Sequence, residues 1–132
     1  MLIKLISDRI ESRSNRILHE RDLTASQFRY LEFLDQKGGP VLFKDAQRHF
    51  QTSQPTVSGI MSRLAEKHMI VIEPANSGRA KTAKLTEKGK RLVDDSRTVR
   101  KNEEERILSA LREEERGPFH DMLERINRQS LE

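Results

Sequence analysis

The stretch that decides the fold is TSQPTVSGIMSRLAEK, Thr52 to Lys67, because it has the form of a helix with one apolar and one polar face. Ser53 can cap the start of this helix, and Pro55 falls in its first turn, where proline is tolerated. The polar face carries short hydroxyls, an amide and a glycine, where Lys and Glu would be usual. The apolar residues recur at helical spacing: Val57, Ile60, Met61 and Leu64.

Such a polar face suits a helix whose backbone comes close to a nucleic acid. Short hydroxyls and an amide can donate to phosphate oxygens or read a base edge, whereas long side chains would obstruct the approach. Gln54 has the amide geometry for adenine, and Thr56 offers a hydroxyl to phosphate or a methyl to thymine. Gly59 lowers helix stability by roughly 1 kcal/mol relative to Ala, which close approach to DNA or to another helix would offset. An ordinary amphipathic helix is the alternative.

Two further helices are predicted upstream. Thr24 to Gln27 has the form of a capping box and opens a helix that runs to about Gln36, before Gly38-Gly39-Pro40. A short helix is then marked by residues at the spacing i, i+3, i+4, i+7: Phe43, Ala46, Gln47 and Phe50. Only the brief turn at 51–52 separates it from the helix that follows, so the pair forms a helix-turn-helix unit.

A β-hairpin is predicted downstream. Met69 to Ile72 is apolar and β-branched, which indicates a strand. Pro74 to Gly78 has turn chemistry, and Ala80 to Leu85 can return as the partner strand. Thr86 can cap the next helix. A helix-turn-helix followed by such a hairpin is a winged helix-turn-helix.

Both ends of the chain are predicted to be helical, with sparse apolar stripes. Residues 2–19 carry Ile3, Ile6 and Ile10 near heptad spacing, which would pack better against a second chain than alone. Hydrophobic residues make up 34% of the chain and charged residues 35%, a thin core that suits a partner subunit. Pro118 cannot donate to the carbonyl four residues earlier, so the last helix should start late or kink at Gly117-Pro118.

Charge is unevenly distributed along the chain. Val41 to Arg91 holds ten Lys and Arg against four Asp and Glu, a balance of +6, although the net charge of the whole chain is +4. A basic middle suggests a polyanion partner, with a solvated surface of uneven composition as the alternative. No apolar run is long enough to span a bilayer, and Asp8 and Arg9 interrupt the apolar start. A cytoplasmic protein is expected.

No catalytic or metal site is predicted. The chain has no Cys, and no two of its four histidines are spaced i, i+4 on one helix. The acidic runs at Asp94-Asp95 and 113–115 lie on exposed helices, and general acid–base catalysis needs burial to separate the two pKa values. The sequence contains neither a phosphate-cradling glycine loop nor a nucleophile elbow. No cofactor and no enzyme activity are expected.

The order and separation of several short motifs resemble the MarR (multiple-antibiotic-resistance regulator) family over nearly the whole chain. The matching motifs are Leu23-Thr24-x-x-Gln27-x-x-x-Leu31-x-x-Leu34, Pro55-Thr56-Val57-Ser58, Leu64-Ala65-Glu66-Lys67, Leu85-Thr86-Glu87-Lys88-Gly89, and Leu111 with Glu114-Glu115-Arg116. The predicted fold is mainly α, a winged helix-turn-helix with a two-stranded β-wing and terminal dimerisation helices. Its expected parts are residues 1–22 for the first dimerisation helix, 23–90 for the DNA-binding domain, and 91–132 for the connector and last helix.

The resemblance implies an obligate homodimer that binds double-stranded DNA at a palindromic operator. Residues 53–67 would enter the major groove, and Arg79 at the hairpin tip would enter the minor groove, where negative potential is enhanced. Such proteins commonly repress transcription and release DNA when a small ligand binds between the dimerisation and DNA-binding parts. His19, Arg29 and Tyr30 are ligand candidates by location only.

Two sets of site residues follow. The predicted DNA contacts are Ser53, Gln54, Pro55, Thr56, Ser58, Gly59, Ser62, Arg63, Arg79, Lys81, Lys84, Lys44 and Arg48, the last four and Arg79 by position and charge. The predicted dimerisation residues are Leu2, Ile3, Ile6, Ile10, Ile107, Leu111, Phe119, Met122, Leu123 and Ile126.

The wing departs from the family pattern. Ser77 stands where an Asp usually braces the wing, and Gly78 stands where a basic residue is usual. These departures leave open a winged-helix dimer that acts as a protein-interaction module with lost or weak DNA binding. A helical adaptor without a wing is a third alternative, which would need residues 70–85 to be unstructured.

Overall fold

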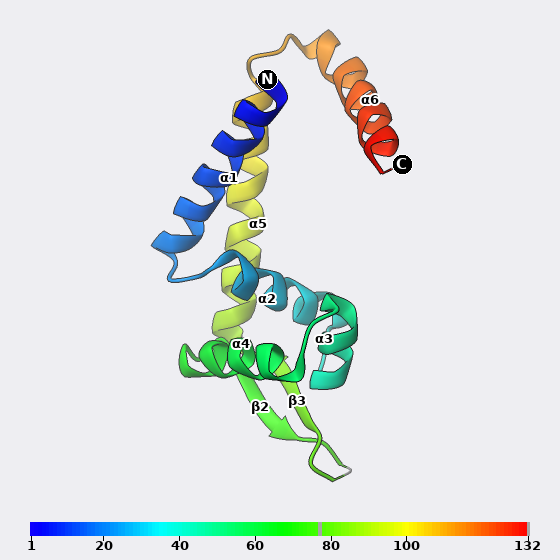
Figure 1. Cartoon of the computed structure of the whole chain (residues 1–132). Coiled ribbons are helices and arrows are strands. Elements are labelled where there is room, and N and C mark those ends of the chain that lie inside the picture. Colours follow the sequence, from blue (N-terminus) through cyan, green and yellow to red (C-terminus); the bar gives the residue numbers. More distant parts are fainter. Residues whose placement is uncertain (77, 132) are drawn as a thin grey trace. The chain divides into compact units, whose positions relative to one another are not determined.

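The protein is described by a computed structural model that covers residues 1–76 and 78–131. Over these residues it is mainly helical, as predicted, with a small antiparallel sheet (Figure 1). Two compact units divide at Ser96 and Arg97. The elements in chain order are α1 (Leu2–Glu20), α2 (Ala25–Lys37), β1 (Val41–Leu42), α3 (Phe43–Phe50), α4 (Gln54–Glu66), β2 (Ile70–Pro74), β3 (Lys81–Leu85), α5 (Glu87–Leu108) and α6 (Glu113–Ser130).

Side-chain caps fix the starts of three helices, each at the residue predicted from the sequence. At α2, Thr24 and Gln27 form the reciprocal capping box, with hydrogen bonds of 3.1 and 3.2 Å between side chain and backbone. At α4, the Ser53 hydroxyl accepts from the backbone N–H of Thr56 at 3.3 Å. At α5, the Thr86 hydroxyl accepts from the backbone N–H of Gly89 at 3.1 Å.

The sheet has three strands in the described residues, in the order β1-β3-β2, all antiparallel. The β2–β3 hairpin was predicted, and its register pairs Ile70 with Leu85. The strand β1 was not predicted, because two residues are too few to show an alternating pattern. It pairs Val41 with Ala83 and so fastens the root of the hairpin to the start of α3. Because both hairpin segments are paired strands, the wing-free helical adaptor is wrong.

The core of the first unit lies between α2, α4 and the sheet. The apolar stripe of α4 faces inward: Val57, Met61 and Leu64 are buried, and Ile60 is half-buried. The start of α5 closes over the end of α4, because a Cβ at Gly89 would lie 2.1 Å from the carbonyl oxygen of Met69. This packing leaves the polar face of α4 outside, as its residue pattern predicts.

In the second unit, the last helix does not start late, so of the two outcomes predicted at Gly117-Pro118 the late start is wrong and the kink stays a prediction. The helix α6 begins at Glu113, and Pro118 is its sixth residue. The Glu115 carboxylate accepts from the backbone N–H of Arg112 at 2.9 Å, and three acidic residues in the first turn favour the positive end of the helix. These terms offset the one hydrogen bond that the proline lacks. Arg116 of α6 forms an ion pair with Glu105 of α5 at 3.5 Å.

Candidate nucleic-acid interface

The exposed face of α4 is the first part of the candidate interface. This helix packs against α2, α3 and β2 in the first unit (Figure 1), and most of its polar residues are exposed. Of the predicted contacts on it, only Ser58 is half-buried. The exposed ones are Ser53, Gln54, Pro55, Thr56, Gly59, Ser62 and Arg63. The structure therefore brings this predicted set together on one surface.

Two hydroxyls at the start of α4 already serve the helix. The hydroxyls of Ser53 and Thr56 lie 2.9 Å apart, and Ser53 also caps the helix. Their main role in the isolated chain is thus to fix the first turn of α4, which leaves Gln54 exposed beside them. Gly59, in contrast, has no visible structural role in the part of the chain that the structure describes, because a Cβ added there would meet nothing within 4 Å. No contact within the described chain requires a glycine at that position.

The hairpin tip is the second part of the candidate interface. Arg79 and Lys81 are exposed there. Gly78 has a φ of +67°, a left-handed conformation that a basic side chain would adopt only with strain. Its departure from the family pattern therefore has a conformational reason. Ser77, the other departure, lies outside the described residues.

The remaining predicted phosphate contacts are exposed, but two of them have acidic partners. Lys84 lies 4.0 Å from Glu73 across the hairpin, and Arg48 lies 3.6 Å from Asp45 within α3. Lys44 is also exposed on α3. Exposed ion pairs of this kind are weak, so they can be exchanged for a phosphate.

A shorter ion pair joins α5 to α2. Lys90 donates to the Asp35 carboxylate at 2.8 Å and lies 3.3 Å from Asp94. The hydrogen bond to Asp35, followed by that to Asp94, raises the pKa of Lys90 above its ordinary value. This positive charge is engaged in holding two helices together.

The location-based ligand candidates have different surroundings. Tyr30 is buried, and its ring stacks on Phe50 at a centroid distance of 4.1 Å. Burial raises the pKa of its phenol. Its ring is therefore part of the core. Arg29 and His19 are exposed, and Arg29 donates to the Ser26 hydroxyl at 3.2 Å.

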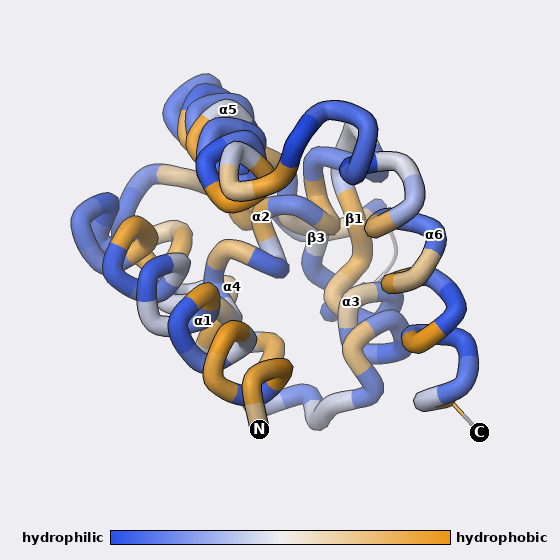
Figure 2. The backbone as a smooth tube through the Cα atoms, turned by 90° about the horizontal axis from the view of Figure 1, so that it is seen from above, coloured by the Kyte–Doolittle hydropathy of each residue, from blue (hydrophilic) through white to orange (hydrophobic). Residues whose placement is uncertain are grey.

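The two terminal helices leave apolar side chains uncovered. None of the 19 residues of α1 and none of the 18 residues of α6 is buried, and the structure describes all of them. Figure 2 shows hydrophobic positions recurring along both helices. The exposed predicted dimerisation residues are Leu2, Ile3, Ile6, Ile10, Ile107, Met122, Leu123 and Ile126, whereas Leu111 and Phe119 are half-buried. Leu5, which is also exposed, was missed although it lies three residues after Leu2.

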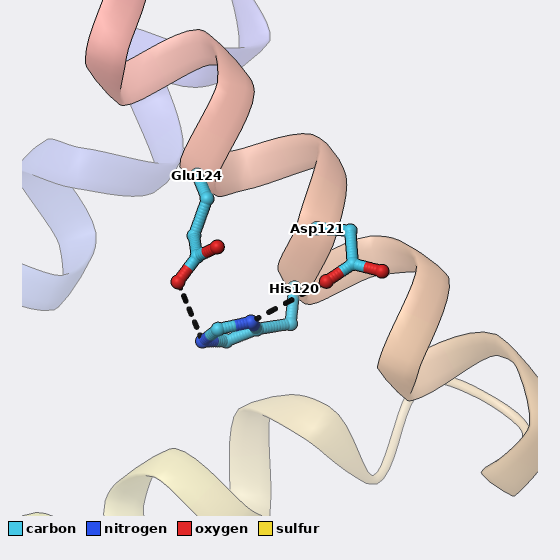
Figure 3. A group of neighbouring side chains, drawn as sticks. All are labelled: His120, Asp121 and Glu124. Carbon is cyan, nitrogen blue, oxygen red and sulfur yellow. Dashed lines mark ion pairs between the residues drawn. The ribbon is translucent and has the colours of Figure 1, made fainter.

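One cluster on α6 combines an imidazole with two carboxylates (Figure 3). Nδ1 of His120 lies 4.0 Å from Asp121, and Nε2 lies 3.9 Å from Glu124 at spacing i, i+4. The spacing of the four histidines alone does not reveal this pair, because its second member is a glutamate. Each carboxylate faces a different ring nitrogen, and all three side chains are exposed. This arrangement is that of a surface ion pair.

No helix in residues 1–76 and 78–131 combines the length and apolar character that crossing a membrane requires.

The comparisons with known proteins agree with this geometry. A sequence model of the MarR family matches residues 21–80, which hold the helix-turn-helix and β2, the first strand of the hairpin. The HTH-type transcriptional regulator MhqR of Bacillus subtilis (strain 168) is 27% identical over 118 residues, which cover 89% of this chain and 81% of MhqR.

Solved structures of MepR, a transcription regulator of the Staphylococcus aureus multidrug efflux pump MepA, have the same fold. One superposes with a TM-score of 0.86 and 26% identity, over 99% of this chain and 96% of MepR. The S. aureus MepR–DNA complex also matches, with a TM-score of 0.71, 26% identity and the same coverage of both chains.

Proposed function

We propose that the chain is a transcriptional regulator of the MarR family that acts as a homodimer bound to double-stranded DNA. Like the relatives it matches, it is a regulator and not an enzyme. One observation carries the proposal. A single compact unit exposes the polar face of α4 and also carries the exposed basic residues of the hairpin tip. The DNA-bound form of MepR, which has this fold, supports the choice of partner.

The helix α4 enters the major groove in this proposal. Its exposed Gln54 suits the N6 and N7 edge of adenine, and Thr56 supplies a methyl group for thymine. The positive end of the helix dipole favours a nearby phosphate. Arg63 lies one turn beyond Gly59 and reaches a groove wall. The remaining predicted contacts of α4 act on the phosphate backbone: Ser53, Pro55, Ser58 and Ser62.

The wing reads the minor groove. Arg79 inserts at the tip, since a guanidinium is drawn to the negative potential of a narrow groove. Lys81 and Lys84 follow along the hairpin and bind phosphates. On α3, Lys44 and Arg48 bind phosphates on the side of the helix-turn-helix. These contacts position the protein on the duplex, while α4 supplies most of the sequence readout.

Dimerisation uses the terminal helices. An apolar face left open along a helix marks an interaction site, and α1 and α6 each have one. A second copy that covers these faces gives a two-fold complex. The operator is then a palindrome with half-sites about one helical turn, roughly 34–36 Å, apart.

Repression and release by a small ligand complete the proposal. The ligand binds beside α1, α2 and the first turns of α5, where Arg29 and His19 are exposed. A gel shift on the operator, repeated with candidate ligands, tests release.

Selection of bound duplexes from a random pool tests the central proposal. The expected result is enrichment of a palindrome, together with retention of the protein on heparin up to high salt. If no sequence is enriched and the protein is not retained on heparin, the alternative function is favoured, a winged-helix dimer that binds proteins.

A further inference from the structure

The carboxyl end of α4 meets the junction between α1 and α2 in a small group of polar contacts. Lys67 caps the end of α4, and its ammonium donates to the Gln27 side-chain oxygen at 3.0 Å. The same ammonium donates to the backbone carbonyl of Asp22 and lies 3.7 Å from the Asp22 carboxylate. Gln27 is 5% exposed. A charged hydrogen bond to a buried amide is stronger and more directional than a surface ion pair.

The other side of the same joint is held by α5. Lys88 donates from Nζ to the backbone carbonyl of Lys67 at 2.8 Å, and Thr86 donates to the carbonyl of His68 at 2.7 Å. The end of α4 is therefore fixed between two elements. One of them is α5, and the other is the chain segment that leaves α1.

The end of α1 is held in the same way. Arg21 donates to the Asp95 carboxylate of α5 at 3.0 Å. The next residue, Asp22, has a left-handed φ of 57°, and its carbonyl accepts from Lys67. Two adjacent residues thus connect α1 to α5 and to α4. A shift of α1 would reach α4 directly through the Lys67 side chain.

We propose that Lys67 is a positioning residue that couples the dimerisation helix α1 to the DNA-reading helix α4. Its contacts with Asp22 and Gln27 fix the direction of α4 relative to α1. In a dimer joined through α1, they set the separation of the two copies of α4 along the duplex. This inference rests on the proposed function, because it needs a dimer on two half-sites.

The experiment compares operators that differ in half-site spacing. The palindrome selected by the unaltered protein is lengthened or shortened by one base pair, which rotates one half-site by about 34–36°. The ratio of affinities for the selected and altered operators is measured by gel shift. The unaltered protein should lose about tenfold or more in affinity per altered base pair, and Lys67→Met should reduce this ratio to about threefold. Because a ratio is compared, a uniform loss of affinity from the missing charge cancels.

Lys88→Met is the matched control. It removes the same charge from the same joint but leaves the contacts of Lys67 with Asp22 and Gln27 in place, so the spacing ratio should stay as in the unaltered protein. Melting curves and sedimentation check that each variant is folded and dimeric. A spacing ratio for Lys67→Met equal to that of the unaltered protein would overturn the proposal.

Gln27→Glu is a second variant that tests the same contact if Lys67→Met does not fold. A glutamate keeps the cap of α2 and accepts more strongly from Lys67, so the spacing ratio should be equal or larger. A smaller ratio would count against the coupling. If the unaltered protein selects no operator, the proposed function itself fails. If an operator is bound and its spacing preference does not depend on Lys67, only the proposal for Lys67 fails.

Discussion

The helices α1 and α4 are both amphipathic, but the apolar face is buried in α4 and exposed in α1. In α4, 13 residues long, the apolar stripe is buried against α2 and the sheet, and the polar face is left for a partner. In α1, 19 residues long, no residue is buried, and the apolar face itself is left open. The same periodicity therefore marks a folded core in one helix and an uncovered surface in the other. This difference is why we propose two partners of different chemistry, a polyanion for α4 and an apolar surface for α1.

The largest expected difference between the two interactions is in their dependence on salt concentration. If the dimer neutralises six to ten phosphates, its DNA affinity should fall about 10³–10⁵-fold between 50 and 200 mM salt. Self-association through α1, which is apolar, should change little over the same range. Gel shifts and sedimentation at matched salt concentrations measure the two effects. Equal salt sensitivity of both would remove the distinction between the helices.

A charge placed in the open face of α1 should break the dimer. Ile6→Glu would bury an unpaired carboxylate, so the dimer should weaken roughly 10²–10³-fold. Sedimentation equilibrium measures this. The first unit should still fold, because Ile6 is exposed in the single chain. Asn15→Glu makes the same addition on the opposite face of the helix and should leave the dimer intact. Equal weakening by both variants would argue against a defined apolar interface.

The wing can be tested by a single substitution. Arg79→Ala should weaken DNA binding by roughly 5- to 150-fold, the range for one specific groove contact, without changing the melting temperature. Lys101→Ala in α5 removes the same charge from outside the proposed interface and serves as the control. Undiminished binding by Arg79→Ala would remove the arginine from the site.

Gly59 offers the smallest effect and the sharpest contrast between folding and binding. Since a Cβ there meets nothing within 4 Å, Gly59→Ala should raise the stability of the chain by about 1 kcal/mol. The same methyl group should hold α4 away from the duplex and lower DNA affinity. Thermal melting and gel shift on one preparation measure both. A variant that is more stable and binds equally well would show that DNA does not require the glycine.

Local signals made most of the fold predictable. The caps at Thr24, Ser53 and Thr86 and the spacing of apolar residues in α4 are properties of neighbouring residues, and the structure confirms each. The short strand β1 was missed because its pairing with Ala83 spans the helix-turn-helix. A late start of α6 was considered because Pro118 lacks an N–H, and the acidic first turn at 113–115, which favours a start at Glu113, was not weighed against it.

The exposure of the candidate site residues was predictable, but the contacts between distant elements were not. The polar face of α4 and the basic tip follow from residue type and position, and the structure exposes them. The contact between Gln27 and Lys67 joins residues 40 positions apart, which no local pattern reveals. Two motifs that seemed independent in the sequence are thus in direct contact.

The pairing of β1 with β3 has a mechanical consequence for the hairpin. Leu42 pairs with Thr82 immediately before α3 begins. The part of the hairpin from Thr82 to its base should therefore move as one rigid piece with the helix-turn-helix. Between Thr82 and the tip, the hairpin has no third strand beside it, so bending should be confined to this outer part. An arginine carried there can adapt to local groove width while the direction in which it enters stays set by the body of the protein.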